Sequence, residues 1–271
     1  MERALPGAIG RDSARFDLRF VLPIPSTAAL HLHFDVFILR MEAFALKGNL
    51  REVARLALPV ALLNLLGVLT LFIDILFCSR LEEGEAALTA LGFSAQIIFL
   101  IQVPMLGFSV GSAALISRAY GARAKERVAS LTRQSLQGAV VLAALTAVSS
   151  PITLPLIVGT LGAEGLAYEL ALDYLFPLFV GIVFYFLQTL SFSLFRSTGD
   201  TRLPLVLGLV VNGLNVPLNW VLIFGQFGLP GLGVEGAAYG TIISQAFGVL
   251  ITLGLIRRGA LGGIPVSLRP S

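Results

Sequence analysis

A single carboxylate lies inside a long apolar stretch of this sequence. Asp74 has apolar neighbours on both sides, in LFIDILF. A charged side chain at the centre of a bilayer costs on the order of 2.5–3.5 kcal/mol on insertion scales, so an acid in that position is a candidate functional group. Such a group can exchange a proton for a metal cation or a cationic solute. The alternative is a carboxylate that simply reaches interfacial water, because Asp74 lies close to the end of its stretch.

Three asparagines form a second candidate group, in VNGLNVPLNW. Asn212, Asn215 and Asn219 are spaced i, i+3 and i+7, which places them on one face of a helix. Their carbonyl oxygens could coordinate a hard monovalent cation. From spacing alone, interhelical hydrogen bonds worth about 1 kcal/mol each are a slightly better explanation.

A further polar face is predicted near the end of the chain. It consists of Thr241, Ser244, Gln245, Gly248 and Thr252. Small and hydroxylated residues at helical spacing are typical of tight helix packing, which is the favoured interpretation here. The sequence assigns no role to three isolated polar residues, Gln96, Gln102 and Gln188.

The elements that must position these residues are membrane-spanning helices. Hydrophobic residues make up 56% of the 271 residues and charged residues 13%, against about 25% in a typical soluble domain. A bilayer core about 30 Å thick needs roughly 20 helical residues. Six apolar stretches are long enough: 56–78, 89–117, 134–158, 170–195, 203–224 and 236–256. Because backbone amides in lipid must be satisfied within their own segment, the sequence predicts an all-α membrane protein, a six-transmembrane-helix bundle.

Prolines occur inside several of these stretches. Pro59, Pro104, Pro177 and Pro217 each remove an amide donor and tend to kink a helix. Two interpretations are about equal: tolerated kinks whose backbone is re-satisfied by neighbours, or bending points of a moving bundle.

Basic residues predict how the helices are oriented. If the stretch before the first helix is cytoplasmic, twelve basic residues fall on the cytoplasmic side: Lys47, Arg51, Arg55, Arg118, Arg123, Lys125, Arg127, Arg133, Arg196, Arg202, Arg257 and Arg258. The opposite side then carries only Arg80. This positive-inside bias predicts a multi-pass protein of the cell membrane, expected to be a bacterial inner membrane, with both termini in the cytoplasm.

The two ends of the chain are predicted to lie outside the bundle. Residues 1–40 carry scattered prolines and charges with no amphipathic period, and no small-residue cleavage site follows an apolar core. We expect them to be a disordered tail or the result of a mis-called start, because a more orderly sequence begins at Met41. The transmembrane lobe is expected at 41–258 and a cytoplasmic tail at 259–271.

Several other kinds of chemistry are disfavoured. The one cysteine, Cys78, cannot form an internal disulfide, and the two histidines, His31 and His33, lie outside the apolar stretches and leave a zinc site poorly supplied with ligands. The sequence has no phosphate-binding glycine loop, nucleophile elbow or HExxH motif, so neither an enzyme nor a cofactor is expected. Its basic residues stand singly or in short clusters, which argues against nucleic acid.

Four pieces of sequence resemble the N-terminal lobe of the multidrug and toxic compound extrusion (MATE) family. LALPVALLNLLGVLTLFIDILFCSRL is similar to the family's first helix, with its proline and late aspartate. GFSVGSAALISRAYGARAKER is similar to the second helix and the basic loop after it. LFRSTGDTRLP resembles the loop between helices four and five, and NVPLNWVLIFGQFGLPGLGVEGAAYGT resembles helix five through the start of helix six. Four such pieces in this order, within 41–258, are specific to the family.

The resemblance implies a polyspecific exporter that expels organic cations and drugs in exchange for H⁺ or Na⁺. Position by position, Asp74 matches the coupling carboxylate, Asn215 the asparagine beside it, and Thr241 a threonine of the same cavity. Asn219 stands where members carry either Asp or Asn, so Asp74 is the one strong acid of the implied site and a two-acid proton relay is doubtful. The implied cation site is therefore Asp74, Asn215, Asn219 and Thr241, which would take either H⁺ or Na⁺, and no other metal site is expected.

Members of this family have two six-helix lobes, whereas this chain has one. We expect a fragment of a longer transporter or, less favoured, a half-transporter that pairs with a second lobe or a second copy of itself. The other expected partners are the lipid bilayer and cationic amphipathic drugs. The rival interpretations are an inert fragment or membrane scaffold without transport, and a flippase of lipid-linked precursors. A flippase would need a basic cavity, and the predicted helix interiors lack Arg and Lys.

Overall fold

The computed structural model describes residues 50–267, with side chains described from Val53 onward. The chain divides into two units, Met1–Val53 and Ala54–Ser271. Of the first unit only the beginning of one helix is described, so everything below concerns the second. The tail expected at 1–40 lies outside the described residues.

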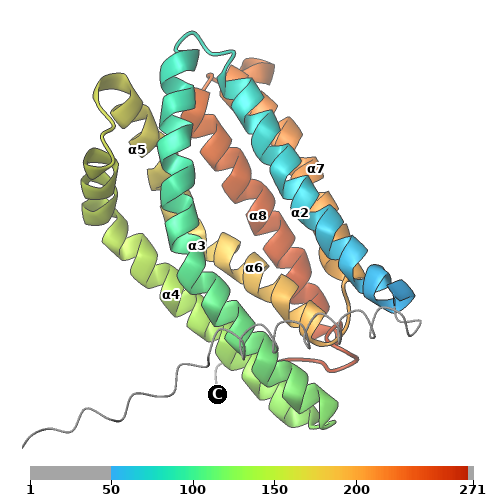
Figure 1. Cartoon of the computed structure of the whole chain (residues 1–271). Helices are drawn as coiled ribbons and strands as arrows, with labels where there is room; N and C mark the ends of the chain where they lie inside the picture. Colours follow the sequence, from blue (N-terminus) through green and yellow to red (C-terminus); the bar gives the residue numbers. More distant parts are fainter. Residues whose placement is uncertain (1–49, 268–271) are drawn as a thin grey trace, which may run out of the picture. The chain divides into compact units, whose positions relative to one another are not determined.

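The described residues form helices joined by short connections (Figure 1). They are α2 (Leu50–Cys78), α3 (Gly84–Gly121), α4 (Lys125–Thr160), α5 (Gly165–Val180), α6 (Ile182–Ser197), α7 (Arg202–Phe224), the 3-10 turn η2 (Gln226–Gly228) and α8 (Gly233–Arg257). Five of these helices are long and apolar enough to cross a membrane alone, and α5 with α6 makes a sixth span. The predicted all-α, six-span membrane bundle is confirmed.

The fourth span differs in form from the continuous helix predicted at 170–195. It bends by 60° between α5 and α6. Pro177 lacks an amide hydrogen and lies one turn before the break, and Gly181 leaves helical geometry with φ −86° and ψ 4°. A Cβ on Gly181 would lie 2.7 Å from Cγ1 of Ile242 on α8. The break therefore coincides with a close approach of α8 that only a glycine allows.

Prolines elsewhere do not interrupt their helices. Pro59 lies within α2, Pro104 within α3 and Pro217 within α7, and each helix continues on both sides. Neighbouring groups in a membrane bundle can re-satisfy the freed carbonyls. Of the four prolines considered from the sequence, only Pro177 is followed by a helix break.

Two apolar clusters lie toward opposite ends of the bundle. The first surrounds Phe186 of α6, and the second surrounds Leu175 of α5. Helix α8 contributes residues within 234–238 to the second cluster and residues within 249–256 to the first. The polar segment 241–245 of α8 is therefore at a level between the two cores.

The residues after α8 pack onto the first cluster. Leu261, Ile264 and Val266 are buried there, and a short bridge pairs Leu261 with Ile264. Apolar burial holds this segment against the helices. The described part of the tail predicted at 259–271 is thus a packed end of the bundle.

Helix α2 is the most exposed of the spanning helices, and Asp74 and Cys78 are the only buried side chains described in it. It lies beside α7 (Figure 1), and four pairs of residues join the two helices in the same order along both: Leu63 with Gly208, Thr70 with Asn212, Asp74 with Asn219, and Phe77 with Phe224. The two helices therefore run parallel, and α2 presents its acid to the polar face of α7.

Candidate functional site

Small residues on α8 allow α7 to approach closely. They stand at every fourth position: Gly236, Gly240, Ser244 and Gly248. Opposite them, in reverse order along α7, are Leu222, Asn219, Asn215 and Val211. Such small-residue spacing is how membrane helices bring their backbones together. The two helices are antiparallel neighbours, and the asparagines of α7 face the hydroxyls of α8.

A chain of hydrogen bonds runs from the acid through both asparagines to α8. Asn219 donates from Nδ2 to Oδ1 of Asp74 at 2.6 Å and to Oδ1 of Asn215 at 3.2 Å. Nδ2 of Asn215 lies 3.2 Å from Oγ1 of Thr241 and 3.4 Å from Oγ of Ser244. The four residues of the predicted site are thus brought together from three helices, and Ser244 joins them.

The carboxylate of Asp74 is buried but has few hydrogen bonds. Its residue is 6% exposed, and among the described residues only the amide of Asn219 donates to it, at Oδ1. A buried charge is costly unless it is paired or well hydrogen-bonded. A bound cation or a proton would therefore stabilise the buried carboxylate of Asp74. The aspartate contributes a single negative charge to the site.

Gly240 leaves the space that Asn219 occupies. A Cβ built on Gly240 would collide with Oδ1 of Asn219 and would lie 3.1 Å from its backbone nitrogen. The side chain of Asn219 is completely buried. Its orientation toward Asp74 therefore depends on a glycine in the facing helix.

Asn212, the third asparagine of the predicted stripe, does not contact Asp74 and hydrogen-bonds elsewhere. Its Oδ1 accepts a 2.8 Å hydrogen bond from Oγ1 of Thr70, and its Nδ2 donates to the carbonyl of Gly208 at 2.7 Å. It therefore ties α7 to α2 beside the acid. All three asparagines make hydrogen bonds between helices, the explanation slightly favoured from the sequence, and Asn219 is the one that contacts the carboxylate.

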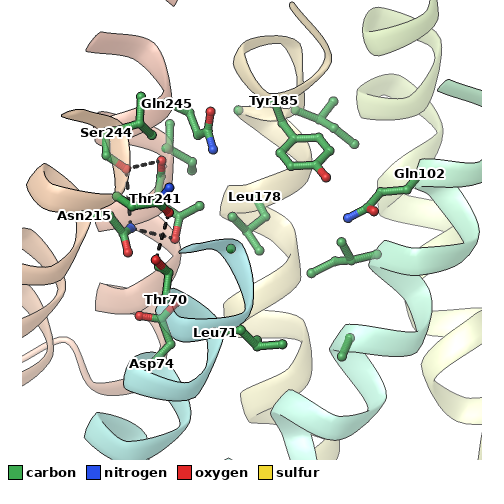
Figure 2. Close-up of a pocket in the computed structure, with 18 of the residues that line it drawn as sticks. Thr70, Leu71, Asp74, Gln102, Leu178, Tyr185, Asn215, Thr241, Ser244 and Gln245 are labelled. Carbon is green, nitrogen blue, oxygen red and sulfur yellow. Dashed lines mark hydrogen bonds between the residues drawn. The ribbon is translucent and has the colours of Figure 1, made fainter. Parts of the chain in front are cut away.

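A cavity of about 610 Å³ opens in front of these groups, and Figure 2 shows 18 of its residues. Its polar wall carries Asn64, Thr70, Asp74, Asn212, Asn215, Thr241 and Ser244. Its other walls are mainly apolar and aromatic and include Phe99, Tyr174, Phe179, Tyr185 and Phe186. None of the residues that the structure places around the cavity is Lys or Arg, so Asp74 gives it a negative character.

The polar face predicted on α8 serves two purposes. Thr241, Ser244 and Gln245 line the cavity. Thr252 is instead buried against α6, where its Oγ1 lies 3.4 Å from Nε2 of Gln188. Packing, the interpretation favoured from the sequence, describes Ser244, Gly248 and Thr252, and Ser244 lines the cavity as well.

Sequence reasoning missed the aromatic wall. Tyr174 and Tyr185 line the cavity from α5 and α6 but stand in apolar, phenylalanine-rich sequence that gives no sign of which face turns inward. Gln102, left without a role, also lines it. A glutamine kept in a spanning helix was the available signal for an inward-facing position.

Within residues 50–267 there is no group of three or more His, Cys, Asp or Glu side chains that could hold a metal ion. One carboxylate with amide and hydroxyl oxygens is an oxygen-only donor set, which hard cations prefer. A proton or a monovalent cation fits the single charge.

Comparison with known proteins gives consistent matches. The family model MatE matches residues 59–221. The chain is 30% identical over 209 residues to "Probable multidrug resistance protein NorM" of Thermotoga maritima and 29% identical over 208 residues to "Probable multidrug resistance protein YoeA" of Bacillus subtilis, covering 77% of this chain and 45% of each relative. A solved structure of a MOP superfamily transporter from Pyrococcus furiosus superposes with a TM-score of 0.72 at 25% identity, covering 81% of this chain and 48% of that one. The chain thus spans about half the length of the relatives it matches.

Proposed function

This chain belongs to the MatE family of membrane transporters, and from that premise we propose that it takes part in the export of organic cations and drugs in exchange for H⁺ or Na⁺. The observation that carries the proposal is the position of Asp74. It is the one acidic residue on the wall of a drug-sized cavity that has no basic lining residue. Its charge can be balanced either by a coupling ion or by a cationic solute.

In this proposal the coupling ion binds at Asp74 with help from Asn215, Asn219 and Thr241. The Asp74 carboxylate supplies the charge, and the amide carbonyls and the hydroxyl supply further oxygens. Asn219 now points its Nδ2 at Asp74, so a bound Na⁺ requires that amide to turn and offer Oδ1 instead. A proton on Oδ2 of Asp74 would need no such turn, because Oδ1 could still accept the hydrogen bond from Asn219.

Turning the amide of Asn219 gives ion binding a way to act on α2. The Asn219–Asp74 hydrogen bond is one of the few contacts between α2 and the rest of the bundle. A ligand shifts a conformational equilibrium only through its different affinity for two states. We infer that ion-bound and ion-free states differ in how α2 rests on α7, and that this changes the wall of the cavity.

Transport as proposed needs a second lobe, in the same polypeptide or in another. Alternating access in repeat-built transporters rocks one bundle against another around a central site. The matched relatives are about twice the length over which this chain aligns with them. A second lobe, or a second copy of this chain, would then close the open side of the cleft.

The proposed orientation has both termini in the cytoplasm of a bacterial inner membrane. It rests on the twelve-to-one bias of basic residues between the two sides. Cationic solutes leaving such a cell move against the membrane potential, at about 2.3 kcal/mol per charge per 100 mV. Exchange for an inward-moving cation offsets that cost.

Binding measurements on the purified full chain test whether a cationic solute and the coupling ion compete for Asp74. Ethidium fluorescence reports binding of an aromatic cation, and exchange at one carboxylate predicts that Na⁺ or a lower pH displaces it. Asp74→Asn should abolish this displacement, whereas Asp173→Asn, which removes an exposed acid of α5, should preserve it. Ethidium binding that is indifferent to both Na⁺ and pH in the unmodified chain would overturn the proposal.

Efflux measurements then test transport. The full chain is expressed in bacteria that lack their own drug pumps, and ethidium accumulation is compared between the unmodified chain and Asp74→Asn. If a second copy of the chain supplies the second lobe, accumulation should be lower with the unmodified chain. Equal accumulation would show that this chain alone does not export the dye.

A further inference from the structure

The connection between α7 and α8 carries large apolar side chains that the rest of the described chain does not cover. Residues 227–231, FGLPG, which we call the α7–α8 tip, are all exposed. Phe227 is 86% exposed and Leu229 is 49% exposed. The sequence around them has no charged residue from 203 to 234. The α7–α8 tip is therefore an apolar projection at one end of the bundle.

Backbone contacts fix the position of the α7–α8 tip. The amide of Leu232 donates to the carbonyl of Leu222 at 2.9 Å, which ties the start of α8 to the end of α7. A Cβ on Gly225 would collide with the backbone of Gly231, so the two sides of the connection pass very close to each other. The α7–α8 tip is thus a defined turn, and its side chains are held out from the bundle by the fold.

Phe227 adopts a backbone conformation that is strained for a residue with a side chain. Its φ is 60° and its ψ is 28°, in the left-handed region, where Cβ crowds the backbone. The nearby Gly225 and Gly228, with φ of 68° and 82°, adopt that region without this cost. Strained residues persist only where the surrounding structure holds them, and they are concentrated at functional positions. A strained, exposed phenylalanine therefore indicates a contact with something outside the described chain.

The length of α7 places the α7–α8 tip at the boundary of the lipid core. The 23 residues of α7 cover about 34 Å, and the hydrocarbon core of a bilayer is about 30 Å thick. The helix begins at Arg202, a basic residue of the kind found at one membrane surface. Its other end, Phe224, then reaches the opposite surface. The α7–α8 tip follows directly, at the level where acyl chains meet headgroups.

The other connection at this end of the bundle has a different composition. The contact between Phe77 and Phe224 places the end of α2 beside the end of α7 (Figure 1). The connection that follows α2 carries Arg80, Glu82 and Glu83, all exposed, as expected of a segment in water. The α7–α8 tip carries no charge at the same end. The two connections therefore suit different surroundings.

The exposed surface of α7 leads directly to the α7–α8 tip. Exposed residues recur at 206, 210, 213, 217 and 220 with the period of a helix, and all of them are apolar. The last of them is Trp220, which is 43% exposed, and Tyr239 on α8 is 38% exposed. Tryptophan and tyrosine are enriched where a bilayer meets water. An apolar stripe that ends in such residues is typical of a lipid-facing surface, and the α7–α8 tip continues it.

We propose that the α7–α8 tip is inserted into the lipid interface, with Phe227 and Leu229 among the headgroups and the first carbons of the acyl chains. The partner is the bilayer itself. Because the turn is rigid, this contact holds the ends of α7 and α8 at a fixed depth. The two helices then form a fixed frame, beside which the loosely attached α2 can shift. This inference does not depend on the proposed export of drugs.

Tryptophan fluorescence tests the depth of the α7–α8 tip, because the chain has a single tryptophan, Trp220. The reporter chain combines Trp220→Phe with Phe227→Trp. The matched control combines Trp220→Phe with Glu82→Trp, which places the reporter in the charged connection after α2. Each full chain is placed in phosphatidylcholine nanodiscs, whose two faces are both open to water. Iodide quenches from water, and phosphatidylcholine brominated near the headgroup end of its acyl chains quenches from lipid.

The proposal predicts opposite responses for the two reporters. Brominated lipid should quench Phe227→Trp as strongly as it quenches Trp220 in the unmodified chain, and iodide should quench it several-fold less than Glu82→Trp. Quenching of Phe227→Trp by iodide and not by brominated lipid would place the α7–α8 tip in water. Protection from both quenchers would place it against protein, such as a second copy of the chain. Either result would overturn the proposal.

A second reporter position keeps the test independent of the strained residue. Leu229 has extended backbone, with φ −80° and ψ 148°, so any side chain fits there without strain. Leu229→Trp with Trp220→Phe should give the same pattern as Phe227→Trp, because both side chains belong to one rigid turn. Quenching of Leu229→Trp by iodide as strong as that of Glu82→Trp would overturn the proposal even if Phe227→Trp failed to fold.

Discussion

Asn219 donates a 2.6 Å hydrogen bond from Nδ2 to Oδ1 of Asp74, a residue 145 positions away in the sequence, and so joins α7 to α2. The contact is completely buried on the Asn219 side, while most of α2 is exposed. The acid that is proposed to bind the coupling ion is therefore also a main attachment point of its helix. Ion binding and the position of α2 are expected to be linked for this reason.

Asp74→Asn should remove the stabilisation of the chain by Na⁺ or protons while changing its free energy of unfolding only slightly. Asparagine keeps an oxygen that can accept the bond from Asn219, so the free energy of unfolding should change by no more than about 1.5 kcal/mol. A cation held at 100 times its dissociation constant stabilises the unmodified chain by about 2.7 kcal/mol, and the variant should lose that gain. Thermal unfolding in detergent across a Na⁺ series and a pH series measures both. Asp173→Asn is the control, and an ion response that survives in Asp74→Asn would contradict the assignment.

The two asparagine contacts to α2 should have different effects. Asn219→Ala removes the donor to both Asp74 and Asn215 and should cost about 1–3 kcal/mol, with faster hydrogen exchange in the second half of α2. Asn212→Ala removes the partly buried contact to Thr70 and should cost about 0.5–1.5 kcal/mol.

Cation affinity distinguishes the two variants further. It should fall in Asn219→Ala and remain unchanged in Asn212→Ala, because only Asn219 touches the acid. Equal losses of affinity in both variants would mean that general loosening of α2, and not the contact to Asp74, controls ion binding.

The fold was predictable because lipid leaves few choices. Apolar stretches as long as 203–224 have to be helical in a bilayer, and the observed α7 matches that range within a residue at its start. The break at Gly181 was not predictable in the same way. A glycine and a proline are tolerated in many spanning helices, and the break depends on Ile242, which approaches from a helix distant in sequence.

The candidate site could be predicted only in its polar half. Asp74, Asn215 and Asn219 are conspicuous because polar groups are costly in lipid, and the family resemblance adds Thr241. Tyr185 is inconspicuous, because an aromatic residue fits a lipid-facing, a packed or a cavity position equally well. Which of these it occupies is decided by tertiary packing, including the 60° bend between α5 and α6.

Gly181→Ala should lower the free energy of unfolding, and the size of this loss should depend on the side chain at position 242. The added methyl meets Cγ1 and Cγ2 of Ile242 at 2.7 and 2.8 Å, and overpacking of this kind costs about 1–3 kcal/mol. Ile242→Ala removes both of these carbon atoms. The double variant should be more stable than the sum of the single effects predicts, by about 0.5–3 kcal/mol. Thermal unfolding of all four proteins gives this coupling, and simple additivity would show that the contact does not determine the break.

Gly240→Ala tests whether the facing helix holds Asn219 in place. The new Cβ collides with Oδ1 of Asn219, so the amide has to leave Asp74 or α8 has to move away. We expect a loss of about 1–3 kcal/mol in the free energy of unfolding and a weaker response to Na⁺ or protons. Gly254→Ala is the matched control on the same helix, because a Cβ there meets no other atom within 4 Å and alanine is the better helix former by about 1 kcal/mol. If Gly240→Ala keeps the full ion response while Gly254→Ala behaves as expected, Asn219 does not need its present orientation for ion binding.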